Sequence, residues 1–264
     1  MSLDRPVPQL KPVIHHFAAC DTQTSNSQQE LIVYINAELA ARQLANSLCA
    51  NPVVAKQFGK VRVFWNSGEN QVLQFVGKGI ADLALVKQNM MDAIKAESTY
   101  GYEEVASYPD YSAYLIAMRE KPQITKEYLL GKRLGLLDYP TSRSGHIIPI
   151  RMLKSLNLSP DTMQITYANS HSELRHLLTS GQVDIISSYW QQNDETTLLK
   201  NYITPIEERI HGSKWYMKME TRNVDLYCAV QDVLVDIATQ QANGYFSQLK
   251  LVPECPGRKN AAIN

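Results

Sequence analysis

The 264-residue sequence lacks a net charge and long apolar runs. Its 26 basic side chains are balanced by 26 acidic ones, so no overall positive field attracts nucleic acid or an anionic membrane surface. Any site for an anion must therefore be local. No apolar stretch approaches the about 18 residues that a transmembrane helix requires. The composition, with 44% hydrophobic and 20% charged residues, is that of a globular protein.

Closely spaced cysteines are also missing. Cys20, Cys49, Cys228 and Cys255 contain no CxxC pair, which argues against a metal or redox site. A disulfide is compatible with the sequence, but its pairing is left open. The polar, proline-rich start, residues 1–12, has neither the basic nor the apolar block of a secretory signal. The chain is then either a cytoplasmic protein or a mature exported protein whose signal has been removed.

Signatures of common catalytic sites are absent as well. The sequence contains no GxSxG, HExxH, GxxxxGK[ST] or GxGxxG motif. His15 and His16 are adjacent, so a strand would point them to opposite faces, which is poor geometry for joint metal ligation. Asp82 and Asp184 each follow a glycine at the start of a strand, where structural capping is the favoured role. We therefore expect no catalytic residues, no metal, no cofactor and no enzymatic activity.

Strands and helices alternate along most of the chain. Ser27 and Glu30 form a capping-box pattern, which predicts a long helix reaching Leu48. Strands separated by helices of this length predict parallel sheets with right-handed crossovers, and hence the α/β fold class. Further predicted strands are residues 13–19, 61–65, 80–86, 133–139, 163–168 and 183–189. Further helices are predicted from 66–69, near 90–95, within 142–156, at 171–180 and over 225–249 in two segments, with extended pieces at 104–119 and 201–219.

One pattern occurs twice at an offset of 102 residues, with Gly79 matching Gly181 and Asp82 matching Asp184. In each copy an i, i+3, i+4 apolar helix stripe ends at a glycine and is followed by a buried strand. The repeat favours two lobes of similar design, in a mostly parallel, two-lobed α/β fold. The predicted first lobe comprises residues 1–118 and 194–264, the second lobe residues 119–193, and the hinge strands lie near 112–122 and 188–205.

The segment from Asp138 to Gly145 joins a predicted strand to a predicted helix. A helix N-terminus leaves about four amides unpaired and carries roughly half a positive charge, which suits a bound anion. Arginine adds a charge-assisted contact, and ligands bind beyond the carboxyl ends of strands in open α/β sheets. A simple N-cap is the competing interpretation of the serines. The predicted ligand-binding residues in this segment are Thr141, Ser142, Arg143, Ser144 and Gly145.

Two later strand ends complete the predicted site. Ser170 and Glu173 form a capping box, which places His171 in the first turn of a helix. Its imidazole is then able to donate a hydrogen bond into the same cleft. The alternative is that this histidine is exposed to solvent. Tyr189 ends the next strand, where it either closes over the ligand or packs under the hinge. In the first lobe, residues 66–68 and 87–89 occupy equivalent strand ends.

These residues resemble the phosphonate-binding family of type 2 periplasmic binding proteins. The resemblance rests on the runs 131–135 and 142–145, on Pro149, Leu153 and His171, and on the run 181–184. In that family a strand leads into a Ser-Thr-Ser-Gly turn, and this turn and the histidine help to hold the phosphonate or phosphate group. The resemblance covers roughly residues 61–190. It implies two lobes that close around a ligand on a hinge, export to the periplasm or tethering outside a membrane, and an ABC transporter as partner.

Arg143 stands where this family usually has threonine. This departure implies an anion that is larger, more highly charged or differently placed, and it leaves phosphate, sulfonate and carboxylate ligands open. The sequence therefore predicts a monomeric extracytoplasmic solute-binding protein that captures a small anion, phosphonate or phosphate-like, for a membrane ABC permease. The alternatives are a ligand-binding sensor domain of a membrane signalling protein, an effector domain of a transcription regulator, and an enzyme on the same scaffold.

Overall fold

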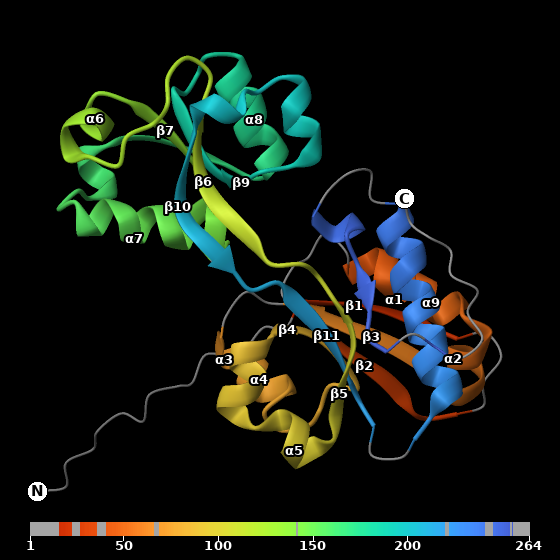
Figure 1. The fold of residues 1–264 in the computed structure, drawn as a ribbon. Coiled ribbons are helices and arrows are strands. Elements are labelled where there is room, and N and C mark those ends of the chain that lie inside the picture. The colour runs from red at the N-terminus through yellow and green to blue at the C-terminus, as the bar shows by residue number, and fades with distance from the viewer. Residues whose placement is uncertain are drawn as a thin grey trace, which may run out of the picture.

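The computed structural model describes residues 16–22, 27–35, 41–65, 69–140, 142–219, 222–240, 245–253 and 255. These residues form two α/β lobes, one built on a seven-stranded sheet and the other on a five-stranded sheet, and two chain segments join them (Figure 1). The predicted fold class, a two-lobed α/β arrangement with mixed sheets, is confirmed. The sheets are not mostly parallel, however, because six of the ten strand pairings among the described residues are antiparallel. Among these residues no helix has both the length and the apolarity needed to cross a bilayer.

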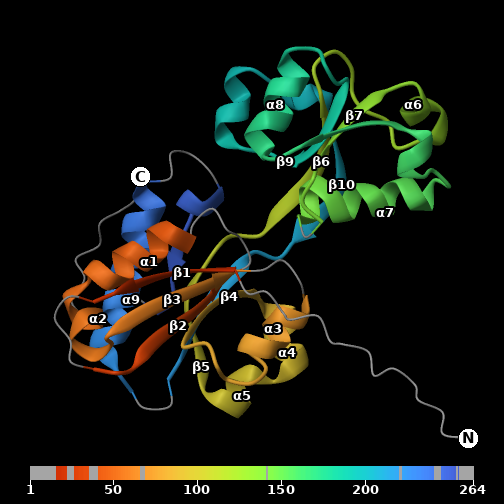
Figure 2. The same ribbon diagram turned by 180° about the vertical axis from the view of Figure 1, so that it is seen from behind.

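The first lobe has helices on both faces of its sheet (Figure 2). One face packs against α1 (Ala41–Ala50), α2 (Pro52–Gln57) and α9 (Val224–Gln240), and the other against α3 (Glu69–Phe75), α4 (Gln88–Ile94) and α5 (Ala96–Tyr100). The strands, in spatial order, are β1 (His16–Asp21), β3 (Lys60–Trp65), β2 (Glu30–Ile35), β4 (Leu83–Lys87), β11 (Ser213–Lys218), β5 (Tyr102–Ser107) and β12 (Lys250–Leu251).

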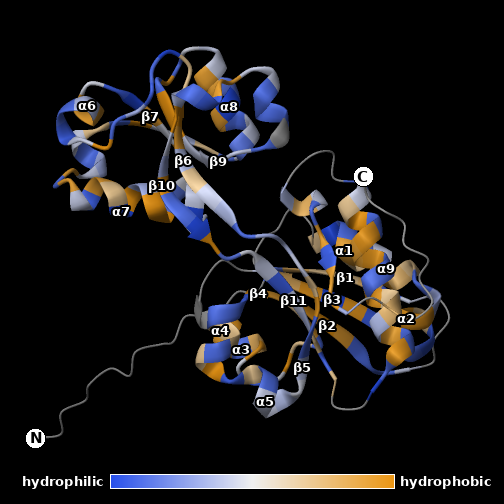
Figure 3. Ribbon diagram, in the orientation of Figure 1, coloured by the Kyte–Doolittle hydropathy of each residue, from blue (hydrophilic) through white to orange (hydrophobic). Residues whose placement is uncertain are grey.

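The second lobe follows the same plan on a smaller scale. Its strands, in spatial order, are β10 (Ile203–Ile210), β6 (Tyr111–Ala117), β9 (Ile185–Tyr189), β7 (Arg133–Leu137) and β8 (Gln164–Ala168). The helices are α6 (Lys126–Leu130), α7 (Ile148–Ser155), which continues from a π-helical turn at Arg143–Ile147, and α8 (His171–Thr179). Apolar residues gather on the strands and the inward helix faces of both lobes (Figure 3).

The helix predicted from Ser27 to Leu48 is wrong at its start. Residues Glu30–Ile35 form β2, which pairs in parallel with β3 on one side and β4 on the other. Leu31, Val33, Tyr34 and Ile35 are all buried because both faces of this central strand are covered by helices. The Ser27 hydroxyl accepts a hydrogen bond from the amide of Gln29 at 3.1 Å, within the segment before β2. Burial of this apolar run in the sheet therefore outweighs the local capping preference for a helix, and α1 begins at Ala41.

The chain crosses between the lobes at residues 108–110 and 211–212, directly before β6 and directly after β10. These positions differ from the predicted lobe boundaries at 118/119 and 193/194 and from the predicted hinges near 112–122 and 188–205. β6 belongs to the second lobe because it pairs with both β9 and β10 there. Leu115 and Ile116 on this strand are completely buried in the cores of the second lobe.

The repeated sequence pattern corresponds to a repeated structural unit. Gly79 and Gly181 both adopt positive φ, 63° and 73°, after an apolar helix. The Asp82 carboxylate accepts the amide of Ile32 at 2.8 Å, and the Asp184 carboxylate accepts the amide of Arg133 at 2.9 Å. Each aspartate thus ties the start of its own strand to the neighbouring parallel strand, which is the structural role predicted for both.

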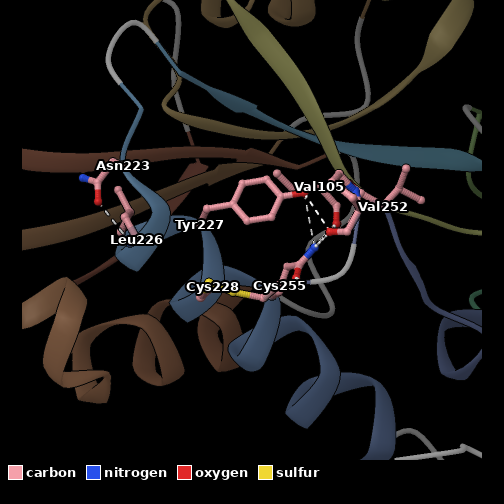
Figure 4. The surroundings of a disulfide bond; sticks show 9 residues. Val105, Asn223, Leu226, Tyr227, Cys228, Val252 and Cys255 are labelled. Carbon is pink, nitrogen blue, oxygen red and sulfur yellow. Dashed lines mark hydrogen bonds between the residues drawn. A yellow bond between two sulfur atoms is a disulfide. The ribbon is translucent and has the colours of Figure 1, made fainter. Parts of the chain in front are cut away.

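All four cysteines are paired. Cys20 of β1 is bonded to Cys49 of α1, and Cys228 of α9 is bonded to Cys255 of the C-terminal segment. Beside the second disulfide bond the side-chain nitrogen Nε2 of Gln231 donates to the carbonyl oxygens of Val105 and Pro253 at 2.9 and 2.7 Å (Figure 4). The C-terminal segment is therefore held against α9 and the β5 edge of the first sheet.

Candidate ligand-binding site

A cavity of about 220 Å³ lies where the two lobes meet. It is smaller than the roughly 300–1,000 Å³ of pockets for drug-sized ligands, which indicates a small ligand. The second lobe contributes the largest part of its wall, and the crossing segments and the first lobe contribute the rest. The lining from the second lobe is Tyr111, Leu137, Tyr139, Ser142, Arg143, Ser144, His171 and Tyr189; the remainder is His211, Ser213, Lys87, Tyr245 and Phe246.

Three residues of the turn after β7, Ser142, Arg143 and Ser144, line this cavity. Ser142 is the N-cap of the π-helical turn: its hydroxyl accepts the amide of Gly145 at 3.2 Å, and its carbonyl accepts the amides of His146 and Ile147 at 3.1 and 2.9 Å. The amides of Arg143 and Ser144 have no acceptor among the described residues. Two adjacent N–H groups at the start of a helical segment form a concave site that favours a bound anion.

This turn is fixed by contacts with the strands beneath it. A Cβ atom on Gly145 would lie 2.6 Å from both Cγ and Cδ1 of Leu137, so only glycine allows the turn to sit directly on β7. The Ser144 carbonyl accepts the hydroxyl of Ser187 in β9 at 2.6 Å. Nδ1 of His146 lies 2.7 Å from the carbonyl oxygen of Leu137. Gly145 therefore shapes the cavity wall from behind and does not line it.

Arg143 is the cation of the turn. It lines the cavity, is partly buried and makes no ion pair with any residue of the described chain. Burial raises the pKa of the nearby Tyr111 to about 12, and the positive charge of Arg143 opposes that increase. Tyr111 is consequently a neutral hydroxyl donor, and Arg143 supplies a positive charge that an anion is able to neutralise.

His171 is held in one tautomer. The Ser188 hydroxyl accepts a hydrogen bond from Nη1 of Arg175 at 3.1 Å and lies 2.8 Å from Nδ1 of His171. Nδ1 is the one acceptor that the Ser188 hydroxyl meets among the described residues, so the hydroxyl donates its proton there and the neutral imidazole carries its own proton on Nε2. Burial, reinforced by the charge of Arg175, lowers the pKa of His171 to about 3. At neutral pH the ring is an uncharged donor.

The predicted capping box before His171 is present in a shifted form. The Ser170 hydroxyl accepts the amide of Glu173 at 3.1 Å, as predicted. The Glu173 carboxylate reaches back to the amide of Asn169 at 2.8 Å, one residue before the N-cap. Both contacts fix the first turn of α8, and His171 therefore faces the cavity and not the solvent.

Replacing His171 with glutamine is expected to flatten the acid dependence of stability. Between about pH 6.5 and 3 the unfolded chain binds a proton at His171 that the folded chain excludes, so the wild type loses stability as pH falls through this range. Glutamine does not titrate. Urea unfolding at pH 7 and pH 4.5 should show a smaller loss in the variant, and equal losses in both proteins would contradict a neutral buried histidine.

Arg175 and Asp194 organise the wall behind His171, and sequence reasoning missed both. Nε and Nη2 of the guanidinium hold the carboxylate at 2.5 and 2.7 Å. Its other donors reach the carbonyls of His171 and Tyr189 and the hydroxyl of Ser188, at 3.1, 2.8 and 3.1 Å. All five N–H groups are therefore used. Nothing in the local pattern around residue 194 indicates this role, because the two residues meet only in the folded lobe.

An aromatic wall covers the side of the cavity next to the crossing segments. The ring of Tyr245 lies 5.1 Å from Tyr111, 6.1 Å from Tyr189 and 5.3 Å from Phe246, centroid to centroid. Tyr245 and Phe246 come from the C-terminal segment that the Cys228–Cys255 bond anchors. Their role was not predicted, since no sequence pattern shows that residues so far along the chain return to this place.

The structure brings most of the predicted site residues together. Ser142, Arg143, Ser144, His171 and Tyr189 all line the same cavity, and Lys87 joins them from the first lobe. Their ligand-binding role stays a prediction. Gln88 and Asn89 do not line the cavity, and Thr141 and residues 66–68 lie outside the described residues.

A family model decides the relationship of this chain to known proteins. The model described as the periplasmic substrate-binding protein of phosphonate ABC transporters matches residues 57–189, which is 133 of the 264 residues. The chain belongs to this family. The matched range includes the turn at residues 142–145, His171 and Tyr189. No protein with a curated function matches the chain in sequence.

Solved structures of low sequence identity are similar to this phosphonate-binding family member. XAC2383 from Xanthomonas citri, bound to chloride, is 12% identical, covers 83% of this chain and 89% of its own, and gives a TM-score of 0.49. PhnD1 from Prochlorococcus marinus, in complex with methylphosphonate, is 14% identical over 83% and 88%, with a TM-score of 0.46. The binding component PA3383 of a phosphonate transporter from Pseudomonas aeruginosa is 16% identical over 85% and 82%, with a TM-score of 0.44.

Proposed function

We propose that this protein captures a small phosphonate or phosphate-like anion in the cavity between its lobes. It does so outside the cytoplasm, for delivery to a membrane ABC permease, and without chemical turnover. The observation that carries this proposal is that Ser142, Arg143 and Ser144 line one cavity, with a guanidinium and with two amides that have no acceptor among the described residues. Membership of the phosphonate-binding family supports it.

In this proposal both lobes contact the anion. From the second lobe the anion accepts hydrogen bonds from the amides of Arg143 and Ser144 and from the hydroxyls of Ser142 and Ser144. It also accepts the Nε2 proton of His171. Lys87 lies on the first-lobe side of the same cavity. Rotation about the crossing segments at 108–110 and 211–212 closes the lobes, and it excludes water from these charge-assisted hydrogen bonds, which strengthens them.

The test is isothermal titration calorimetry with methylphosphonate, inorganic phosphate, sulfate and acetate. The double variant Ser142→Ala with Ser144→Ala is expected to bind methylphosphonate more weakly by about 1–3 kcal/mol, since each lost hydroxyl removes a hydrogen bond to a charged group. The matched control, Ser98→Ala with Ser155→Ala, removes two hydroxyls that do not line the cavity and should leave affinity unchanged.

Two outcomes contradict the proposal. Unchanged methylphosphonate affinity in the double variant would show that the turn is not the anion site. Chemical conversion of the bound compound, followed by phosphorus NMR over hours, would show that the protein is an enzyme and not a receptor.

A further inference from the structure

The charged side chains that line the cavity are cationic at neutral pH. Lys87 at the end of β4 and Arg143 in the turn after β7 approach the cavity from different lobes. His211 also lines the cavity, from the second crossing segment. No described lining residue carries a carboxylate. These positive side chains attract the anionic end of a ligand. They also repel any positive charge on its substituent.

The carboxylates just behind this wall are already committed to other cations. Asp110, next to Tyr111, accepts Nε of Arg209 at 3.1 Å and the amide of Gly212 at 3.2 Å, and pairs with His211. Burial opposes ionisation, but these hydrogen bonds outweigh it and lower the pKa of Asp110. Asp194 is held by the Arg175 guanidinium. Neither Asp110 nor Asp194 lines the cavity.

The remaining wall is aromatic and uncharged. Burial raises the pKa of Tyr111 to about 12 and also raises the pKa of Tyr189 and of Tyr245, so all three phenols stay protonated at neutral pH. Phe246 packs edge-on against Tyr245 and is 41% exposed at the mouth of the cavity. A substituent that points away from the anion turn therefore meets ring faces and edges.

We propose that this site selects phosphonates or phosphate esters whose substituent is uncharged and apolar, and that it discriminates against substituents carrying an ammonium group. The proposal rests on the proposed function, binding of a phosphonate-like anion. An ammonium group held near Lys87 and Arg143 is repelled and finds no carboxylate among the described lining residues. An alkyl or aryl group instead gains by leaving water against the aromatic wall.

Calorimetry at pH 7.5 with two phosphonates of equal length tests the discrimination. n-Propylphosphonate and 2-aminoethylphosphonate differ in one terminal group, CH₃ against NH₃⁺. We expect the propyl compound to bind at least tenfold more tightly. Equal affinity, or tighter binding of the amino compound, would overturn this inference while leaving the proposed function intact. Failure of both compounds and of methylphosphonate to bind would overturn the proposed function, and this inference with it.

The aromatic wall is tested separately with Phe246→Ala. This change should weaken phenylphosphonate binding at least fivefold and change methylphosphonate binding less than twofold, because only the larger substituent reaches the ring. Phe17→Ala, which removes a half-exposed phenylalanine of β1 that is not part of the cavity lining, should alter neither affinity. Equal losses for both ligands with Phe246→Ala would contradict the proposed role of the ring.

Discussion

Replacing Arg175 with methionine is expected to lower the free energy of unfolding by about 3–5 kcal/mol, because it leaves a buried carboxylate without its partner. The side chains of Arg175 and Asp194 are 14% and 4% exposed. Asp194 also accepts the amide of Gln191 at 2.8 Å, so it is not free to turn toward solvent. Urea denaturation of the purified protein measures the loss.

Arg133→Met is the matched control for this variant. Arg133 pairs with Asp184 in the same lobe, but these side chains are 44% and 37% exposed. Solvent weakens such a pair, and we expect a much smaller loss than in Arg175→Met. The double change Arg175→Met with Asp194→Asn should recover part of the stability lost in Arg175→Met, since it removes the uncompensated charge. Equal stabilities of Arg175→Met and Arg133→Met would refute the buried-pair argument.

Arg175→Met should also weaken methylphosphonate binding. The guanidinium holds the carbonyls of His171 and Tyr189 and orients the Ser188 hydroxyl toward His171. Without the guanidinium, His171 and Tyr189 lose the hydrogen bonds that position them in the cavity wall, although neither residue is itself substituted. Calorimetry on the folded variant, in conditions where circular dichroism confirms that it is folded, separates this effect from the loss of stability.

Replacing Gly212 with alanine is expected to cost about 3 kcal/mol of stability and to disturb the closure of the lobes. A Cβ atom at this position would lie 2.1 Å from the carbonyl oxygen of Tyr108 and 2.7 Å from that of Pro109. Both are backbone atoms of the other crossing segment, so no side-chain rotation relieves the overlap. The two segments must move apart, with the cost of overpacking. Urea denaturation and methylphosphonate calorimetry measure the two effects.

Gly131→Ala provides the control for the hinge variant. A Cβ atom on Gly131 meets no atom within 4 Å, and this residue has a negative φ of −88°. Alanine there should be neutral, or slightly stabilising by restricting the unfolded chain. If Gly212→Ala matched Gly131→Ala in both stability and affinity, the close contact of the two crossing segments would have no role in holding the hinge.

Local sequence patterns predicted correctly those helices and strands for which the local conformational preference and the tertiary packing favour the same structure. The helical turn after β7 was predicted because hydroxyls, arginine and glycine follow a buried strand, and α8 was predicted from its cap and its apolar stripe. The same reasoning failed at Ser27–Leu48. There the capping pattern favours a helix, whereas burial on both faces of the sheet favours a strand for Leu31–Ile35. Tertiary burial outweighs local preference at such positions.

The sequence by itself determined the α/β class, the two-lobed repeat, the turn at a helix start in residues 142–145 and the resemblance to phosphonate-binding proteins. Only the tertiary structure decided where the chain crosses between lobes, which cysteines pair, and that Tyr245 and Phe246 return to the cavity. It also decided that Asp194 is the partner of Arg175. The physical reason is that periodicity and capping report contacts within a few residues. Pairings between distant segments depend on how the finished sheets and helices pack, and no local pattern encodes them.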